Sequence, residues 1–294
     1  MKLIFVFLGI LMSSALAQAQ SETNCGEQLT DGQRTYNRRL KTMAEDMGLQ
    51  LRVYLGENAD NAALVSRAGA DFSTRKFQSP SNQKYSHTGI AIKDSKTGQW
   101  KFVHLLNDCA GPSSSLHQQG LAEFFMDDPF MLDVRVLVPS IELQHKIVQA
   151  IEDRANGGRG LAHVLHNPSY SNIANPFALE YQNSNMWVMA IVASAQSGAT
   201  SLAAAQSYYE RKGFQPSQVE ISSLEAFLGP IFTKNAKTDD HSDEESSSGW
   251  YNFAASAGVN KYLRATDQLV ADKELCYKSG CDTVVRGNLI PDTP

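Results

Sequence analysis

Three short segments of the chain hold the residue types that acyl chemistry requires. The segments YSHTGIAI and KFVHLLN each contain one histidine, His87 and His104, and the segment EYQNSNMWV contains Ser184. A serine hydroxyl beside an imidazole attacks amide and ester carbonyls, because the imidazole takes the hydroxyl proton while a third group holds it in one tautomer. We therefore predict that Ser184 is the nucleophile, that His87 is the general base and then the acid for the leaving group, and that His104 orients His87.

The alternation of apolar residues predicts a hairpin that places the two histidines side by side. Tyr85–Lys93 and Trp100–Leu106 have the pattern of strands joined by the turn-forming sequence DSKTG. Residues directly opposite each other in such a pair have Cβ atoms about 5 Å apart. Ile90 and Ile92 share the core-facing side of the first strand, so His87 faces the other side. The alternative interpretation is a cross-strand histidine pair that only holds the sheet together.

Ser184 precedes an apolar segment, Asn185–Ser197, that predicts a buried helix. The first N–H groups of a helix carry a partial positive charge, so the Ser184 N–H, together with Gln182 or Tyr181, can hold the oxyanion of an acyl intermediate. The alternative is that Ser184 is an ordinary helix cap, since serine is a preferred residue at that position.

The rest of the chain predicts a mixture of helices and strands. Apolar residues recur at helical spacing over Thr30–Met47, Gly48 ends that helix, and Leu49–Leu55 alternates like a strand. Lys237–Gly249 is acidic and rich in serine, which predicts a solvated loop. The other expected strands are Ala62–Ala68, Leu132–Val138 and Gln218–Ile221. The other expected helices are the segment that follows Ser140, Leu202–Lys212 and Val259–Val270, and Leu116–Phe125 is expected to be a helix or helical turns. Together these elements indicate an α+β protein in which helices pack on an antiparallel sheet.

Taken together, the three segments resemble the permuted papain-like enzymes, namely the circularly permuted NlpC-type families and the lecithin retinol acyltransferase group. In those proteins a strand with His-x-Gly-Ile precedes a strand with a polar residue, often histidine, and then a helix that begins with Asn-Cys. His-Thr-Gly-Ile matches at His87, Val-His-Leu matches at His104, and Asn183-Ser184-Asn185 matches the start of the helix. The resemblance implies a permuted papain-like fold, and it implies an acyl hydrolase or transferase that acts on a cell-envelope peptide or an acyl lipid.

At the level of a single family, the chain resembles the bacterial domain-of-unknown-function family 2145. The segments RAGADFS, YSHTGIA, VHLLNDC, FFMDDPF and YQNSNMWV carry this likeness, which spans Cys25–His241. Ser184 stands where the papain-like families have cysteine, and a serine hydroxyl is far less acidic than a thiol and needs its base during attack. The second hypothesis is therefore a catalytically inactive envelope protein that binds peptide or lipid in the same groove, with Tyr181 and Trp187 against the ligand.

The N-terminus has the pattern of a secretory signal peptide. Lys2 is followed by the apolar run Leu3–Met12 and by small residues that offer an A-x-A cleavage site, and this run is too short to span a bilayer comfortably. We predict a signal peptide over residues 1–19 and a protein that is periplasmic or secreted, with no transmembrane segment after cleavage. The remainder divides into a papain-like domain (20–236), the acidic loop (237–249) and a C-terminal extension with a helix and a cysteine pair (250–294).

Composition limits the partners and cofactors. The formal net charge is −5 and the chain has no basic stripe, so nucleic acid is not an expected partner. Cys25, Cys109, Cys276 and Cys281 form an even set in a chain with an export signal, which indicates disulfides. The short turn-like spacing pairs Cys276 with Cys281 and leaves Cys25 with Cys109, and free thiols are the alternative. We expect neither a cofactor nor a metal, because no histidine lies near the C-terminal cysteine pair at ligand spacing.

Overall fold

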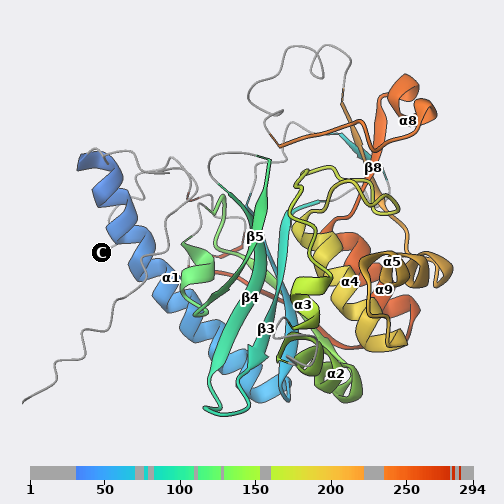
Figure 1. The fold of residues 1–294 in the computed structure, drawn as a ribbon. Helices are drawn as coiled ribbons and strands as arrows, with labels where there is room; N and C mark the ends of the chain where they lie inside the picture. The colour runs from blue at the N-terminus through green and yellow to red at the C-terminus, as the bar shows by residue number, and fades with distance from the viewer. Residues whose placement is uncertain are drawn as a thin grey trace, which may run out of the picture.

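The protein combines two antiparallel sheets with helices that pack on them (Figure 1). The structure is a computed structural model that describes residues 31–69, 76–78, 83–108, 112–126, 129–152, 160–221, 235–278, 280–281 and 285. The larger sheet contains β1 (Ala62–Arg67), β3 (His87–Lys93), β4 (Trp100–Asn107), β5 (Ser114–Gln119), β6 (Val134–Pro139) and β9 (Leu269–Leu275). The smaller sheet contains β2 (Phe77–Gln78), β7 (Ser217–Glu220) and β8 (Trp250–Phe253). The helices are α1 (Asp31–Asn58), η2 (Glu123–Phe125, a 3-10 helix), α2 (Ile141–Glu152), α3 (Leu161–Val164), α4 (Ser184–Ser197), α5 (Leu202–Arg211), α8 (Asp243–Ser248) and α9 (Ser256–Ala265).

The larger sheet has the strand order β5-β4-β3-β1-β6-β9, and every neighbouring pair is antiparallel. The predicted hairpin is present, because β3 pairs with β4 across the short turn between them. The α+β class that we expected, with helices on an antiparallel sheet, is therefore confirmed.

Helices cover both faces of the larger sheet. Successive strand residues point to opposite faces, so Ala91 of β3 packs with α1 and η2, whereas Ile90 and Ile92 pack with α2, α4 and α9. Figure 1 shows α1 on one side of the sheet and α2, α4, α5 and α9 on the other. The alternation predicted for this strand from Ile90 and Ile92 is thus confirmed.

α4 is the central helix of the second face. Its residues from Ser184 to Ala195 are all buried, because the sheet and three other helices surround it, and this is why the helix is apolar on every side. Within the described part of the chain no single helix is long and apolar enough to cross a membrane. α4 and α5 pass that test only jointly, with a bend of 80° between them.

The segment Leu49–Leu55, which was predicted to be a strand, belongs to the helix α1, so that prediction was wrong. The helix continues through Gly48 to Asn58, and Leu51 and Leu55 extend the helical spacing of buried residues that Met47 begins. Gly48 lies inside the helix because a Cβ atom there would be 2.8 Å from the backbone of Ala122, just before η2. The glycine therefore serves close packing rather than helix termination.

Three other predictions were wrong, the first two because pairing between distant strands leaves little local periodicity. Leu116–Phe125 is helical only at its end, where η2 forms, because its first part belongs to β5, which pairs with β4. The segment predicted as Val259–Val270 ends as a helix at Ala265, and Asp267 turns the chain into β9 with a positive φ of 52°. The acidic segment contains the short helix α8, and Ser242 and Glu245 form a reciprocal capping box at its start.

Candidate functional site

His87, His104 and Gln119 form a chain of hydrogen bonds across three neighbouring strands, β3, β4 and β5. His87 Nε2 lies 2.9 Å from His104 Nδ1, and His104 Nε2 lies 2.9 Å from Gln119 Oε1. The amide oxygen of Gln119 only accepts, so His104 donates through Nε2 and accepts at Nδ1. His87 then donates through Nε2 and keeps a lone pair on Nδ1. The structure thus brings the two predicted histidines into contact and fixes one tautomer for each.

Gly89 provides the space for this contact. A Cβ atom at Gly89 would lie 2.6 Å from the Cβ of His104 and would also meet the ring of Phe102. A side chain at this position would push His104 away from His87, so the glycine of the His-Thr-Gly-Ile sequence has a packing reason.

The imidazoles lie on the face of the sheet that α1 and η2 cover. The ring centroid of Phe124 in η2 lies 6.0 Å from that of His87 and 5.6 Å from that of His104. The guanidinium of Arg67, which pairs with His87 in the register of β1 and β3, lies 5.1 Å from the same phenyl centroid. His104 is fully buried and His87 is half-buried.

Both imidazoles are neutral at pH 7. Burial, followed by the positive charge of Arg67, lowers the pKa of His104 to about 3. Burial, then Arg67 and then His104 lower the pKa of His87 well below its usual value. A general base works best when its pKa lies near the working pH, so His87 is a weak base in this environment.

Ser184 is the first residue of α4 and is buried. The residue that caps the helix is its predecessor Asn183, whose side chain accepts a hydrogen bond of 2.9 Å from the Met186 N–H. The interpretation of Ser184 as the cap is therefore wrong, and the serine has the position that a helix-start nucleophile requires.

Asn185 fastens the start of α4 to β3. Its side-chain amide donates to the Ser86 carbonyl at 3.2 Å, and its amide oxygen accepts from Thr88 Oγ1 at 2.6 Å. Ser86 and Thr88 flank His87, but Thr88 points to the α4 face of the sheet, whereas His87 points to the η2 face. Among the described residues no hydrogen bond joins Ser184 to either imidazole. The structure therefore brings the two histidines together and leaves Ser184 apart from their hydrogen-bond chain.

The residues predicted to assist Ser184 have other partners. The amide of Gln182 donates to the Leu165 carbonyl at 3.0 Å, and the hydroxyl of Tyr181 donates to Asp239 at 3.0 Å. Trp187 is fully buried, and its Nε1–H donates to a backbone carbonyl in α3. Trp187 is thus a core residue, which corrects the expectation that it contacts a ligand.

A different serine and histidine lie in contact. Ser114 Oγ, at the start of β5, lies 3.0 Å from Nε2 of His166, which follows α3. Burial and then the charge of His163 lower the pKa of His166, which favours the neutral imidazole and, as at His87, weakens it as a base. Sequence analysis missed the pair because 52 residues separate its members and His166 lies in a loop-like segment without a repeating pattern.

Cys276 and Cys281 form the predicted disulfide, with Cα atoms 4.8 Å apart. The second expected pair, Cys25 and Cys109, and the predicted signal peptide over 1–19 lie outside the described residues.

Comparison with known families decides the relationship of the chain. Residues 54–263 match the family described as uncharacterized protein conserved in bacteria, DUF2145. The chain belongs to the DUF2145 family. No curated protein and no solved structure matches the chain. The family expectation is therefore confirmed, while the resemblance to papain-like enzymes stays a prediction.

In this DUF2145 protein both histidine sites belong to the matched part of the chain. His87, His104, Ser114, His166 and Ser184 all lie within residues 54–263, whereas the Cys276–Cys281 disulfide lies beyond the end of the match.

Proposed function

We propose that this DUF2145 protein is exported and binds a ligand without catalysing a reaction. The observation that carries the proposal is the hydrogen-bond chain of His87, His104 and Gln119, which engages neutral imidazoles on the face of the sheet away from Ser184. A serine hydroxyl needs a base during attack, and neither imidazole makes a hydrogen bond to Ser184 among the described residues. A disulfide supports export, because disulfides persist in oxidising compartments.

The cavity that would hold the ligand lies where α2, α4, α5 and α9 meet. It has a volume of about 460 Å³, which is within the range of small-molecule sites. Lys146 and Lys212 bring positive charge to its walls, and Glu142 and Asp267 bring negative charge. Walls with both signs of charge suit a short zwitterionic peptide of the cell envelope better than an acyl lipid, whose chain needs apolar walls.

Calorimetric titration of the purified protein tests this proposal. The probe is a cell-wall tripeptide with free ammonium and carboxylate groups, and a long-chain fatty acid is the comparison ligand. We expect the tripeptide to bind and Lys212→Glu to weaken it by at least about tenfold. Lys41→Glu is the matched control, because Lys41 lies on α1 and is 64% exposed. Binding of the fatty acid alone, or an equal loss in the control, would contradict the proposed ligand and site.

The contact between Ser114 and His166 favours a second candidate, a serine acyl hydrolase or transferase. At 3.0 Å the hydroxyl and the imidazole have the separation of a nucleophile and its base. Ser114 would attack an amide or ester carbonyl, His166 would take its proton and return it to the leaving group, and water or another acceptor would then take the acyl group.

A fluorophosphonate label followed by peptide mapping separates the candidates, because it reacts with activated serines. The binding proposal expects no labelled serine. A label on Ser114 that is lost in Ser114→Ala and in His166→Gln would establish the second candidate. A label on Ser184 that depends on His87 would instead establish the catalytic role predicted for Ser184, His87 and His104 and overturn the binding proposal.

A further inference from the structure

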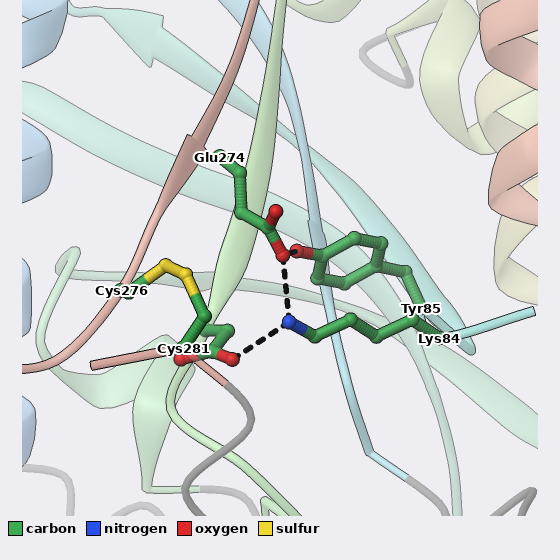
Figure 2. Close-up of a disulfide and its surroundings, with 6 residues drawn as sticks. Lys84, Tyr85, Glu274, Cys276 and Cys281 are labelled. Atoms are coloured by element: carbon green, nitrogen blue, oxygen red, sulfur yellow. Dashed lines mark hydrogen bonds and ion pairs between the residues drawn. A yellow bond between two sulfur atoms is a disulfide. The ribbon is translucent and has the colours of Figure 1, made fainter. Parts of the chain in front are cut away.

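A cluster of charged and sulfur-containing side chains surrounds the disulfide at the end of β9. Figure 2 shows Lys84 and Tyr85 reaching Glu274 beside Cys276 and Cys281. Tyr85 donates its hydroxyl proton to Glu274, and Asp133, which precedes β6, lies in the same cluster. The segments before β3, before β6 and at the end of β9 thus meet at one place.

Four of these side chains are spaced as the ligands of one metal ion. One oxygen each of Asp133 and Glu274 and the two sulfurs of the disulfide all lie within 4.8 Å of one another. Tetrahedral zinc has bonds of about 2.3 Å to sulfur and about 2.0–2.2 Å to oxygen, which puts neighbouring ligand atoms about 3.3–3.8 Å apart. Small side-chain movements would therefore close the set around an ion.

The position already holds a positive charge. The ammonium of Lys84 lies 2.8 Å from Asp133 Oδ2 and 2.6 Å from Glu274 Oε1, and the Lys84 side chain is only 17% exposed. The Asp133 side chain is 1% exposed, and a carboxylate so deeply buried requires a cation in contact. Lys84 is long and flexible, so its ammonium can move to solvent when another cation takes its place.

The disulfide is open to attack. Cys281 is exposed and Cys276 is half-buried, and only the four residues YKSG separate them. We propose that reduction of this disulfide creates a binding site for Zn²⁺, with Cys276, Cys281, Asp133 and Glu274 as its ligands. This site is separate from the cavity and from the histidine chain, so its test does not depend on the ligand proposed for the cavity.

The site forms in two steps, reduction of the disulfide and then binding of Zn²⁺. A dithiol reductant gives two hydrogens to the Cys276–Cys281 bond and becomes a cyclic disulfide itself, which leaves two thiols on the protein. Zn²⁺ then replaces the two thiol protons, which go to the buffer, and displaces the Lys84 ammonium from the two carboxylates.

Titration of the full chain with Cd²⁺ and with Zn²⁺, before and after reduction by a trialkylphosphine, tests the proposal. Cd²⁺ reports thiolate ligands by its ultraviolet charge-transfer band, and Zn²⁺ binding is followed by the release of protons. We expect one ion at this site in the reduced chain and none at this site in the oxidised chain. The double variant Asp133→Asn, Glu274→Gln should weaken binding at least about tenfold, since even the loss of outer partners of a metal site costs that much.

Two further variants make the outcome decisive. Asp46→Asn is the matched control, because Asp46 accepts from Lys278 in the same loop at 2.7 Å but is not among the four ligands. Lys84→Met should bind more tightly than the wild type, a gain that a misfolded variant would not show. If the carboxylate variants bind as the wild type does, the site is a simple dithiol and the four-ligand proposal fails. If the oxidised chain binds the metal ion equally well, the proposal that reduction of the disulfide creates the site is wrong.

Discussion

The protonation of His104 links the histidine chain to the stability of the fold. Its pKa falls from an ordinary value of 6.5 to about 3 on folding, because burial and Arg67 oppose a second charge. In this range the unfolded chain binds a proton that the folded chain does not, so the contribution to stability is complete above pH 6.5 and is lost as the pH falls toward 3.

We therefore predict that acid weakens the fold across this range by up to about 1.4 kcal/mol per pH unit for such a group. Urea unfolding at a series of pH values from neutral to mildly acidic measures the slope. His104→Gln has no proton to bind, so its stability should vary less with pH than that of the wild type. A variant with the same slope as the wild type would show that His104 titrates normally in the folded protein.

Gln119 supplies the last acceptor of the chain, and its removal takes away the hydrogen bond of 2.9 Å to Nε2 of His104. We predict that Gln119→Leu lowers the free energy of unfolding by about 0.5–1.5 kcal/mol, the usual net contribution of a hydrogen bond. Gln118→Leu is the control, because Gln118 is exposed on the other side of β5. Equal loss in both variants would mean that the hydrogen bond contributes little.

The two histidines could be predicted from sequence because one local hairpin determines their separation. The place of Ser184 could not, since it depends on the face of the sheet on which α4 packs, and no pattern within the helix encodes that choice. The contact of Ser114 with His166 depends in turn on a loop that reaches the edge of the sheet. Long-range packing therefore decided which serine meets an imidazole.

At the level of the elements, α1 shows how an alternating pattern misleads. Leu49 and Val53 are exposed, whereas Leu51 and Leu55 are fully buried, and residues two apart on a helix alternate in the same way over a short stretch. The predictions of helices before and after the hairpin were correct where the sequence shows one clear apolar face. β5 and β9 were not predicted, because edge strands with many polar residues have no such apolar face.

The glycines of α1 offer a matched test of its packing. Gly48→Ala places a methyl group against the backbone of Ala122, which cannot move aside, so we predict a loss of about 1–3 kcal/mol from overpacking. Gly56→Ala has nothing within 4 Å and should instead stabilise the helix by about 0.5–1 kcal/mol. Thermal unfolding of both variants distinguishes these signs, and a gain at Gly48 would show that α1 and η2 do not touch.

At the scale of the whole molecule, residues 264–275 are part of the fold rather than an appendage. The family match ends at residue 263, yet β9 completes the larger sheet by pairing with β6. Asp272 of β9 accepts two hydrogen bonds of 2.7 Å from Arg135 of β6 and others from Arg264 and Asn260 of α9. One carboxylate thus joins the C-terminal strand to two other elements.

The hydrogen bonds of Asp272 make its charge important for the stability of the fold. Burial alone would raise the pKa of Asp272, but the hydrogen bonds from Arg135, Arg264 and Asn260 outweigh it and lower the pKa to about 2. The ionised form therefore stabilises the fold above about pH 4, and this contribution is lost as the pH falls through 2.

Asp272→Asn keeps the shape of the side chain and removes its charge. We therefore predict that it lowers the free energy of unfolding by about 1.5–3 kcal/mol at neutral pH, measured by urea unfolding. Glu142→Gln removes a carboxylate that is 77% exposed in its pair with Lys146 and should leave stability unchanged. If both variants unfold at the same urea concentration as the wild type, the C-terminal strand is held by its backbone pairing with β6 and not by Asp272.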